Sequence, residues 1–173
     1  GAFHEVAPAV FDGVEYTKPF KLYRVDNECN DYELRWMSVY IEGVSRDLLQ
    51  ELVRHHYQTA PSVRSTRYCD ESCSNFIAHP ALDDETRVLA EEAAGQSRAA
   101  YSKIFAALKA KNTPLKVARG AARCVLPGGT ETKLVYSASV KQWQWLASMR
   151  VHSAADLEIQ NLAKECVKQL ELN

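Results

Sequence analysis

Apolar residues recur at helical spacing in several segments, and these segments predict the helices of the chain. The expected helices span 45–56, 85–111, 114–124, 140–150 and 154–170. Ser45 is a suitable N-cap for the first helix, and Asp83 or Asp84 for the second, which is the longest. Pro114 suits the first turn of the third helix. The chain therefore has a large predicted helical content.

Alternating or β-branched and aromatic residues predict a smaller number of strands between these helices. The expected extended segments are 20–25, 34–44, 64–68 and 132–139. Gly43 is expected to end the second of them, and Pro61 to close off the helix before the third. Residues 1–30 are otherwise expected to be irregular, and 69–84 to form a loop long enough to cover a ligand. The element order predicts an α/β (α+β) fold, a small mixed sheet packed with helices, in a single domain over 1–173.

The charges nearly cancel, with 21 Lys and Arg against 22 Asp and Glu. No overall field draws such a protein to nucleic acid or to an anionic membrane, so any anion site must be local. No apolar run of about 18 residues or signal-peptide pattern predicts a membrane span or secretion. Five cysteines form an odd set without a regular framework: Cys29, Cys69, Cys73, Cys124 and Cys166. We therefore expect reduced thiols in a soluble, cytoplasmic protein.

Common catalytic motifs are missing from the sequence. No GxGxxG or GxxxxGK[ST] predicts a dinucleotide or P-loop site, and no GxSxG surrounds a serine. The spacing of Cys69, Cys73 and His79 matches no strong zinc signature, and His55 and His56 point to different faces of a helix. We therefore expect no metal site and no protein nucleophile.

Arginines gather at the ends of predicted elements, where binding sites usually form. They are Arg54, Arg64, Arg67, Arg123 and Arg150. A guanidinium binds phosphate oxygens in a planar, bidentate manner, and Ser65 adds a hydroxyl and a backbone N–H beside Arg67. The alternative is that these are ordinary solvated side chains, as most charged residues are. Similarly, Trp143 and Trp145 are either core or interface aromatics, or ligand stackers.

The order of several motifs resembles the flavin-dependent thymidylate synthases over roughly residues 33–170. These motifs are IEGVSRDLLQELVRHH, STRY, ARCVLP, MR and LEIQNLA. The family signature is Arg-His-Arg at a helix end followed seven residues on by Ser-x-Arg. Here Arg54-His55-His56 is followed eight residues on by Ser65-Thr66-Arg67. Arg123 and Arg150 fall where the family has an Arg before Val-Leu-Pro and an Arg ahead of the last helix.

The resemblance implies a transferase that methylates C5 of dUMP to give dTMP. Such flavoproteins use FAD reduced by NADPH, with 5,10-methylenetetrahydrofolate as the one-carbon donor, and attack the uracil with no protein nucleophile. They are homotetramers whose sites are shared between subunits. Carried over by position, Arg150 is the catalytic residue, and Glu51 stands at a nucleotide-binding Gln. The implied nucleotide-binding residues are Glu51, Arg54, Arg64, Ser65, Arg67, Arg123 and Arg150. The implied cofactor-binding residues are Arg54, His55, His56, Ser62, Ser139 and Lys141.

Departures from the family pattern gather on the flavin side. His56 replaces an Arg, Ser62-Val63 replaces Asn-Glu, and Cys29 replaces a His. Ser139 and Trp145 stand where asparagines are usual, whereas the phosphate and pyrimidine positions are kept. Three hypotheses therefore stay open. They are flavin-dependent methylation of dUMP, an altered reaction such as UMP methylation or hydroxymethyl transfer to a pyrimidine nucleotide, and nucleotide binding without catalysis.

Overall fold

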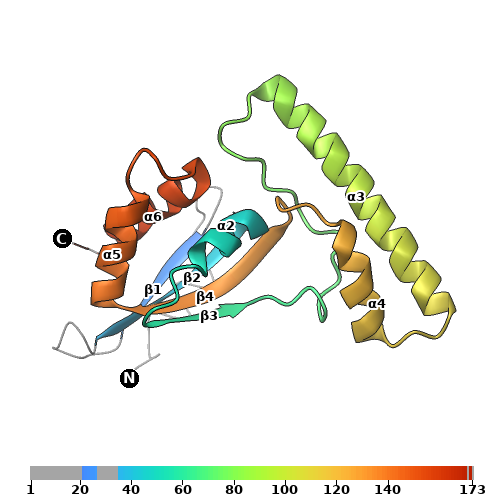
Figure 1. Cartoon of the computed structure of the whole chain (residues 1–173), viewed down its shortest axis with the longest axis horizontal. Coiled ribbons are helices and arrows are strands. Elements are labelled where there is room, and N and C mark those ends of the chain that lie inside the picture. The colour runs from blue at the N-terminus through green and yellow to red at the C-terminus, as the bar shows by residue number, and fades with distance from the viewer. Residues whose placement is uncertain (1–20, 27–34, 171, 173) are drawn as a thin grey trace. The chain divides into compact units, whose positions relative to one another are not determined.

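The computed structural model describes residues 21–26, 35–170 and 172 (Figure 1). The chain divides into two compact units, which are described separately below. The first contains Gly1–Val44, Leu48–Val63 and Lys133–Asn173, and the second contains Ser45–Asp47 and Arg64–Thr132. The single domain expected over the whole chain stays a prediction. Of the irregular segment expected over residues 1–30, all but 21–26 lies outside the described residues.

The sheet has four strands in the order β1-β2-β4-β3. Their bounds are β1 Lys21–Asp26, β2 Trp36–Ser45, β3 Thr59–Val63 and β4 Glu131–Ser139. β1 pairs antiparallel with β2, and β3 pairs antiparallel with β4. In β2 the buried residues alternate, with Met37, Val39 and Ile41 on the core side. This period of two is the one that a strand with a single buried face requires. Three predicted strands are therefore confirmed.

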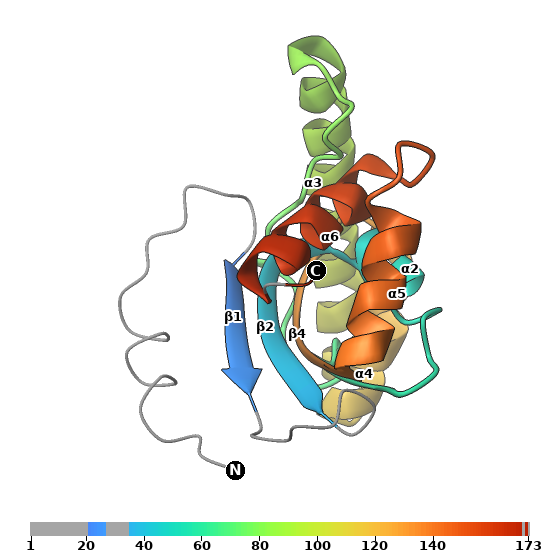
Figure 2. The ribbon, with the colours of Figure 1, turned by 90° about the vertical axis from the view of Figure 1, so that its left-hand side faces the viewer.

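Three helices cover one face of this sheet, as Figure 2 shows. They are α2 Arg46–Leu52, α5 Val140–Arg150 and α6 Leu157–Gln169. Their apolar residues join those of β2 and β4 in one core. Trp143 is 1% exposed, and its indole N–H donates to the carbonyl of Met37 at 3.0 Å. Trp143 is thus a core residue, whereas Trp145 is 49% exposed.

The second unit contains α3 Asp84–Ala110, α4 Leu115–Ala122 and the 3-10 helix η1 Arg123–Val125. α3 and α4 lie side by side (Figure 1). Asp83 caps α3, because its carboxylate accepts the backbone N–H of Thr86 at 2.9 Å. The apolar stripe predicted for this helix is only partly covered, since Val88 and Leu89 are more than half exposed. The bounds of the longest predicted helix are nevertheless confirmed within one residue.

The segment after α2 departs from expectation. α2 ends at Leu52, four residues before the predicted end, because the chain turns at Val53 and Arg54. A strand predicted over 64–68 lies instead at Thr59–Val63, and the turn that follows it covers 66–68. Pro61 is tolerated in β3 because this is an edge strand, where a missing N–H need not cost a ladder bond. The expectation that Pro61 closes off the preceding helix is therefore wrong, because α2 has already ended at Leu52 and Pro61 lies inside β3.

Two further boundaries shift. β2 continues past Gly43 to Ser45, and Gly43 has a φ of 72°, which a glycine adopts without strain. The predicted end of the strand at Gly43 is therefore wrong. α6 begins at Leu157 instead of residue 154, because the Asp156 side chain caps it by accepting the N–H of Glu158. The position of the capping residue therefore defines the first residue of the helix more closely than the spacing of apolar residues does.

The expectations of no membrane span and of reduced cysteines can be compared with the described residues. Within them, no helix has both the length and the apolar character needed to cross a bilayer. Cys69, Cys73, Cys124 and Cys166 are free thiols. Cys29 lies outside the described residues.

Candidate functional site

The turn after β3 carries the predicted phosphate-binding residues. The Ser65 carbonyl accepts the backbone N–H groups of Tyr68 at 3.1 Å and Cys69 at 3.0 Å. The Ser65 hydroxyl also accepts the N–H of Arg67 at 3.3 Å. This is the local hydrogen bonding by which a serine stabilises a turn. It leaves Arg67 exposed, with no hydrogen bond or ion pair from its guanidinium to any described residue.

Arg123 lies beside this turn, although it is far away in sequence. It is the first residue of η1, directly after α4. Its Nη1 donates to Oγ1 of Thr66 at 3.0 Å, and Thr66 is 3% exposed. Arg67 also lies against this end of α4, because a Cβ placed on Gly120 would be 3.5 Å from its Nε. The structure therefore brings Ser65, Arg67 and Arg123 together.

Arg64 is placed differently from its neighbours. Its Nη2 lies 3.3 Å from Oε1 of Glu71 and donates to the carbonyl of Asp70 at 3.3 Å. Glu71 is 1% exposed, and burial raises the pKa of its carboxyl group, opposed by the nearby Arg64 and Arg46. Arg64 thus compensates a buried carboxylate, a role that sequence reasoning did not assign to it.

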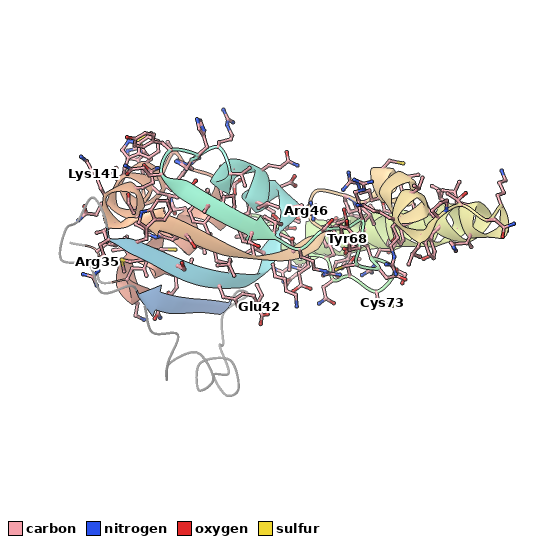
Figure 3. All side chains as sticks on the ribbon, turned by 90° about the horizontal axis from the view of Figure 1, so that it is seen from below. Arg35, Glu42, Arg46, Tyr68, Cys73 and Lys141 are labelled. Carbon is pink, nitrogen blue, oxygen red and sulfur yellow. The ribbon has the colours of Figure 1, made fainter. Side chains whose placement is uncertain are left out.

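Arg46 adds a further positive charge to this cluster in the second unit. It opens α2, and Figure 3 labels it together with Tyr68. Burial lowers the pKa of the Arg46 guanidinium, and Glu71 opposes that shift. Arg123 and Arg64 lower it further by repulsion. Arg46, Arg64 and Arg123 therefore add to the positive potential of the second unit beside the turn.

Basic side chains of α4 were missed by the sequence analysis. Arg119 donates through Nη1 to the carbonyl of Tyr68, and Lys116 donates to the Tyr68 hydroxyl. The hydrogen bond from Lys116 lowers the pKa of Tyr68. Arg119 precedes Arg123 by four residues, and this helical spacing could have signalled it. Glu71 carries no comparable signal, because nothing in its local sequence predicts burial.

A second cluster lies in the first unit and surrounds Arg150, the last residue of α5. Its Nη1 donates to Oε2 of Glu51 at 3.0 Å, and its Nε donates to Nε2 of His55 at 2.8 Å. Burial raises the pKa of Glu51, Asp156 adds to the rise, and Arg150 opposes it. The structure therefore brings together three predicted residues from α2, the turn after it and α5.

His55 occupies a closely defined position in this cluster. It is 5% exposed, and its ring packs edge-on against Trp145 with centroids 5.1 Å apart. Its carbonyl accepts the hydroxyls of Tyr136 at 2.8 Å and Thr59 at 2.9 Å. Burial lowers the pKa of its imidazole, and the cations of Arg150 and Arg54 lower it further. Burial and both cations therefore favour the neutral form of His55, and its Nδ1 has no partner among the described residues.

The other predicted cofactor residues are not gathered into this cluster. Arg54, His56 and Ser62 are exposed, and His56 Nδ1 lies 2.9 Å from the carbonyl of Arg54. Lys141 is exposed at the beginning of α5 (Figure 3). Ser139 is fully buried as the N-cap of α5, where its hydroxyl accepts the N–H of Gln142 and donates to Gln58. His55 is buried and His56 is exposed, so the two side chains do face different ways, but they lie after the end of α2 and not on two faces of a helix as expected.

Metal ligation has no geometric support in the part of the chain that the structure describes. There, no group of three or more His, Cys, Asp and Glu residues could hold an ion. The described residues contain instead guanidinium groups in two different settings. Arg67 and Arg123 can bind an anion at the turn, and Arg150 is held by two acceptors.

Comparisons with known proteins give one family and several relatives. Residues 32–172 match the model of the family described as thymidylate synthase complementing protein. Flavin-dependent thymidylate synthases of Mycolicibacterium vanbaalenii and Mycobacterium tuberculosis are each 40% identical over 143 residues. The match covers 78% of this chain and 57% of each relative. The chain therefore spans little more than half the length of these relatives.

A solved structure shows a similar fold. It is the crystal structure of Thymidylate Synthase X from Helicobacter pylori with FAD and dUMP, which has a TM-score of 0.59 and 23% sequence identity. The similarity covers 80% of this chain and 68% of that chain. It confirms the predicted class of a small sheet packed with helices.

Proposed function

This chain belongs to the family of thymidylate synthase complementing proteins, and we propose that it transfers a one-carbon unit to C5 of dUMP to give dTMP. The names of its relatives support this reaction. The observation that carries the proposal is the turn at Ser65, where an uncommitted Arg67 stands beside an Arg123 anchored on Thr66. That arrangement suits a nucleotide phosphate, which two guanidinium groups and a serine hydroxyl can bind together.

Arg150 is proposed to act on the pyrimidine. Its guanidinium is held in place by Glu51 and His55, so little reorganisation is needed when a ligand binds. A fixed positive charge beside the uracil stabilises negative charge that develops on the ring and makes C5 more nucleophilic. Glu51 and Arg54 are proposed as further nucleotide contacts. Arg64 is proposed to act only by supporting the turn, because Glu71 and Asp70 already engage it.

The residues on the flavin side fit a cofactor in part. The buried Nδ1 of His55 has no partner among the described residues and can donate a hydrogen bond to an acceptor atom of a ligand. Arg54, His56 and Ser62 are exposed and accessible. The Ser139 hydroxyl is already engaged at its helix cap, which argues for a supporting role there. We propose FAD as the bound cofactor, with NADPH as its reductant and 5,10-methylenetetrahydrofolate as the one-carbon donor.

Assembly and location are proposed on the same basis. We propose a cytoplasmic homotetramer with sites shared between subunits, as the resemblance implies. The exposure of Trp145, at 49%, supports a role for this side chain at a subunit contact or beside a ligand. Sedimentation of the purified protein measures the subunit number directly.

Product analysis tests the reaction. The purified chain is incubated with FAD, NADPH and methylenetetrahydrofolate and with dUMP, UMP or dCMP, and the nucleotides are identified by mass spectrometry. We expect dTMP from dUMP and no product after Arg150→Ala. A hydroxymethylated nucleotide, or a product from UMP alone, would replace the proposed reaction by an altered one. Nucleotide binding without any product would show that the protein binds nucleotides but does not catalyse the reaction.

A further inference from the structure

The hydrogen bond between Arg150 and His55 fixes the chemical form of the histidine. A guanidinium only donates hydrogen bonds, so the Nε2 atom that receives Arg150 Nε–H at 2.8 Å must carry a lone pair. The imidazole is then neutral, and its one proton lies on Nδ1. Arg150 is therefore held by one neutral acceptor and by one carboxylate, that of Glu51.

The groups that face His55 all favour this form. Arg150 approaches from α5 and Arg54 belongs to the same turn, and both cations oppose a charged imidazole. From β4, the Tyr136 hydroxyl contacts the His55 carbonyl and not the ring. Trp145 contributes an apolar ring edge from α5. The carboxylate of Glu51, which belongs to the same cluster, is bonded to Arg150.

The free Nδ1–H shows which contact orients the ring. This atom is buried and has no acceptor among the described residues, although a buried unsatisfied donor destabilises the fold. A histidine present only to fill the core would be expected to satisfy both nitrogens or to be replaced by an apolar residue. Instead, the ring keeps its Nε2 contact with Arg150 and leaves the other nitrogen open. Among the described residues, the hydrogen bond with Arg150 is thus the one that orients the ring.

We propose that His55 is a positioning residue for Arg150: its neutral Nδ1–H form accepts Arg150 Nε–H and, with Glu51, aims the guanidinium at the pyrimidine. This inference rests on the proposed function of Arg150. When Nε2 is protonated, the His55 imidazolium and the Arg150 guanidinium face each other with an N–H donor and a positive charge on each side. The contact then breaks, and Arg150 keeps Glu51 as its remaining anchor. The fall of kcat at low pH is therefore set by the protonation of His55.

Nuclear magnetic resonance tests the form of the histidine without any turnover. The protein is labelled with nitrogen-15 at histidine, and His55→Gln identifies the His55 signals. We expect a neutral ring protonated on Nδ1 near pH 7, which titrates below the ordinary histidine value because burial and the two arginines lower its pKa. A ring protonated on Nε2, or one charged at neutral pH, would overturn the proposal whether or not the protein is an active enzyme.

Kinetics then tests the positioning role. His55→Gln retains an acceptor oxygen near the Nε2 position but does not titrate, so we expect it to keep measurable kcat and to lose the acid limb of the pH profile. His55→Phe retains a ring but no acceptor, and we expect kcat to fall by on the order of 100-fold with a smaller change in KM for dUMP. His152→Gln, at an exposed histidine, is the control and should leave the profile unchanged.

The outcomes separate the two proposals. Retention of full kcat by His55→Phe, or of the acid limb by His55→Gln, would show that His55 does not position Arg150. Absence of dTMP formation by the wild-type protein would refute the proposed function, while the tautomer measurement would still decide the Arg150–His55 contact. Circular dichroism of both variants identifies loss of folding, and His55→Gln together with the tautomer measurement remains decisive if His55→Phe does not fold.

Discussion

At the scale of single residues, arginines that look equivalent in the sequence differ by what they contact. Arg64 compensates the buried Glu71, and Arg123 is anchored on Thr66. Arg67 keeps its guanidinium uncommitted among the described residues, and Arg150 has two acceptors. An arginine already paired with a buried carboxylate has less to gain from a phosphate. The hydrogen-bond and ion-pair partners of each arginine therefore indicate its role, which the sequence alone leaves open.

Thr66 is predicted to be a specific support for the phosphate site. Thr66→Val keeps the shape of the side chain but removes the hydroxyl that accepts Arg123 Nη1 at 3.0 Å. We expect the Kd for dUMP to rise by roughly 10-fold, because a hydrogen bond from a charged group contributes on the order of 1.5 kcal/mol. Calorimetric titration measures this change. Thr113→Val, between α3 and α4, is the control, and equal affinities for both variants would contradict the role given to Thr66.

The residues of the Arg150 cluster could be predicted only through family resemblance. Arg150 follows His55 by 95 positions and Glu51 by 99, so no local spacing predicts their contact. Ser65 and Arg67 were identified from motif spacing in the sequence, although the sequence predicted an extended segment over 64–68, where the structure has a turn. Glu71 could not be predicted, since burial of a carboxylate depends on tertiary packing.

At the scale of elements, helices with clear caps were predicted best. α3 begins after Asp83 and α5 after Ser139, and both side chains accept a backbone N–H of the first turn. β3 was missed because Pro61 is a strong local break signal, which the edge position of the strand overrides. Local signals therefore placed α3 and α5 to within one residue, whereas an edge strand is defined by the neighbour that it joins.

Gly129, just before β4, and Gly95, inside α3, offer a matched pair of glycine substitutions. A Cβ on Gly129 would lie 2.3 Å from the Phe76 ring and 3.1 Å from the Ile77 carbonyl, so Gly129→Ala forces both to move. We expect the free energy of unfolding to fall by about 1–3 kcal/mol. Gly95 has no atom within 4 Å of its Cβ position and lies inside α3, so Gly95→Ala should add about 0.5–1 kcal/mol.

Urea unfolding measures both glycine variants under the same conditions. Opposite signs are expected, because one substitution meets a packed ring and the other improves helix propensity. If Gly129→Ala were as stable as the wild type, the contact between β4 and the Phe76 segment would not be as tight as described.

At the scale of the whole molecule, the core of the first unit predicts sensitivity to alkali. Burial raises the pKa of the Cys166 thiol from 9.0 to about 12 and that of the Tyr136 hydroxyl from 10.0 to about 12. In the unfolded chain both groups ionise at their ordinary values. Their contribution to stability is therefore complete below about pH 9 and is lost as the pH rises toward 12.

Cys166→Ala isolates the thiol contribution to this alkaline loss. Near pH 7 we expect the variant to be less stable than the wild type, because it loses a buried side-chain atom. Between pH 9 and 11 the difference should narrow, since the wild type alone loses the stability linked to thiol ionisation. Unfolding in urea at several pH values measures it. A difference independent of pH would contradict the burial of this thiol.

The central claim is the transfer of a one-carbon unit to dUMP, and isotope labelling tests it most directly. The wild-type chain is given dUMP, FAD, NADPH and methylenetetrahydrofolate labelled with carbon-13 in its methylene group, and the nucleotides are analysed by mass spectrometry and carbon-13 resonance. The account predicts label in the C5 methyl group of dTMP. Recovery of unlabelled dUMP alone, from a protein that binds dUMP in calorimetry, would contradict it.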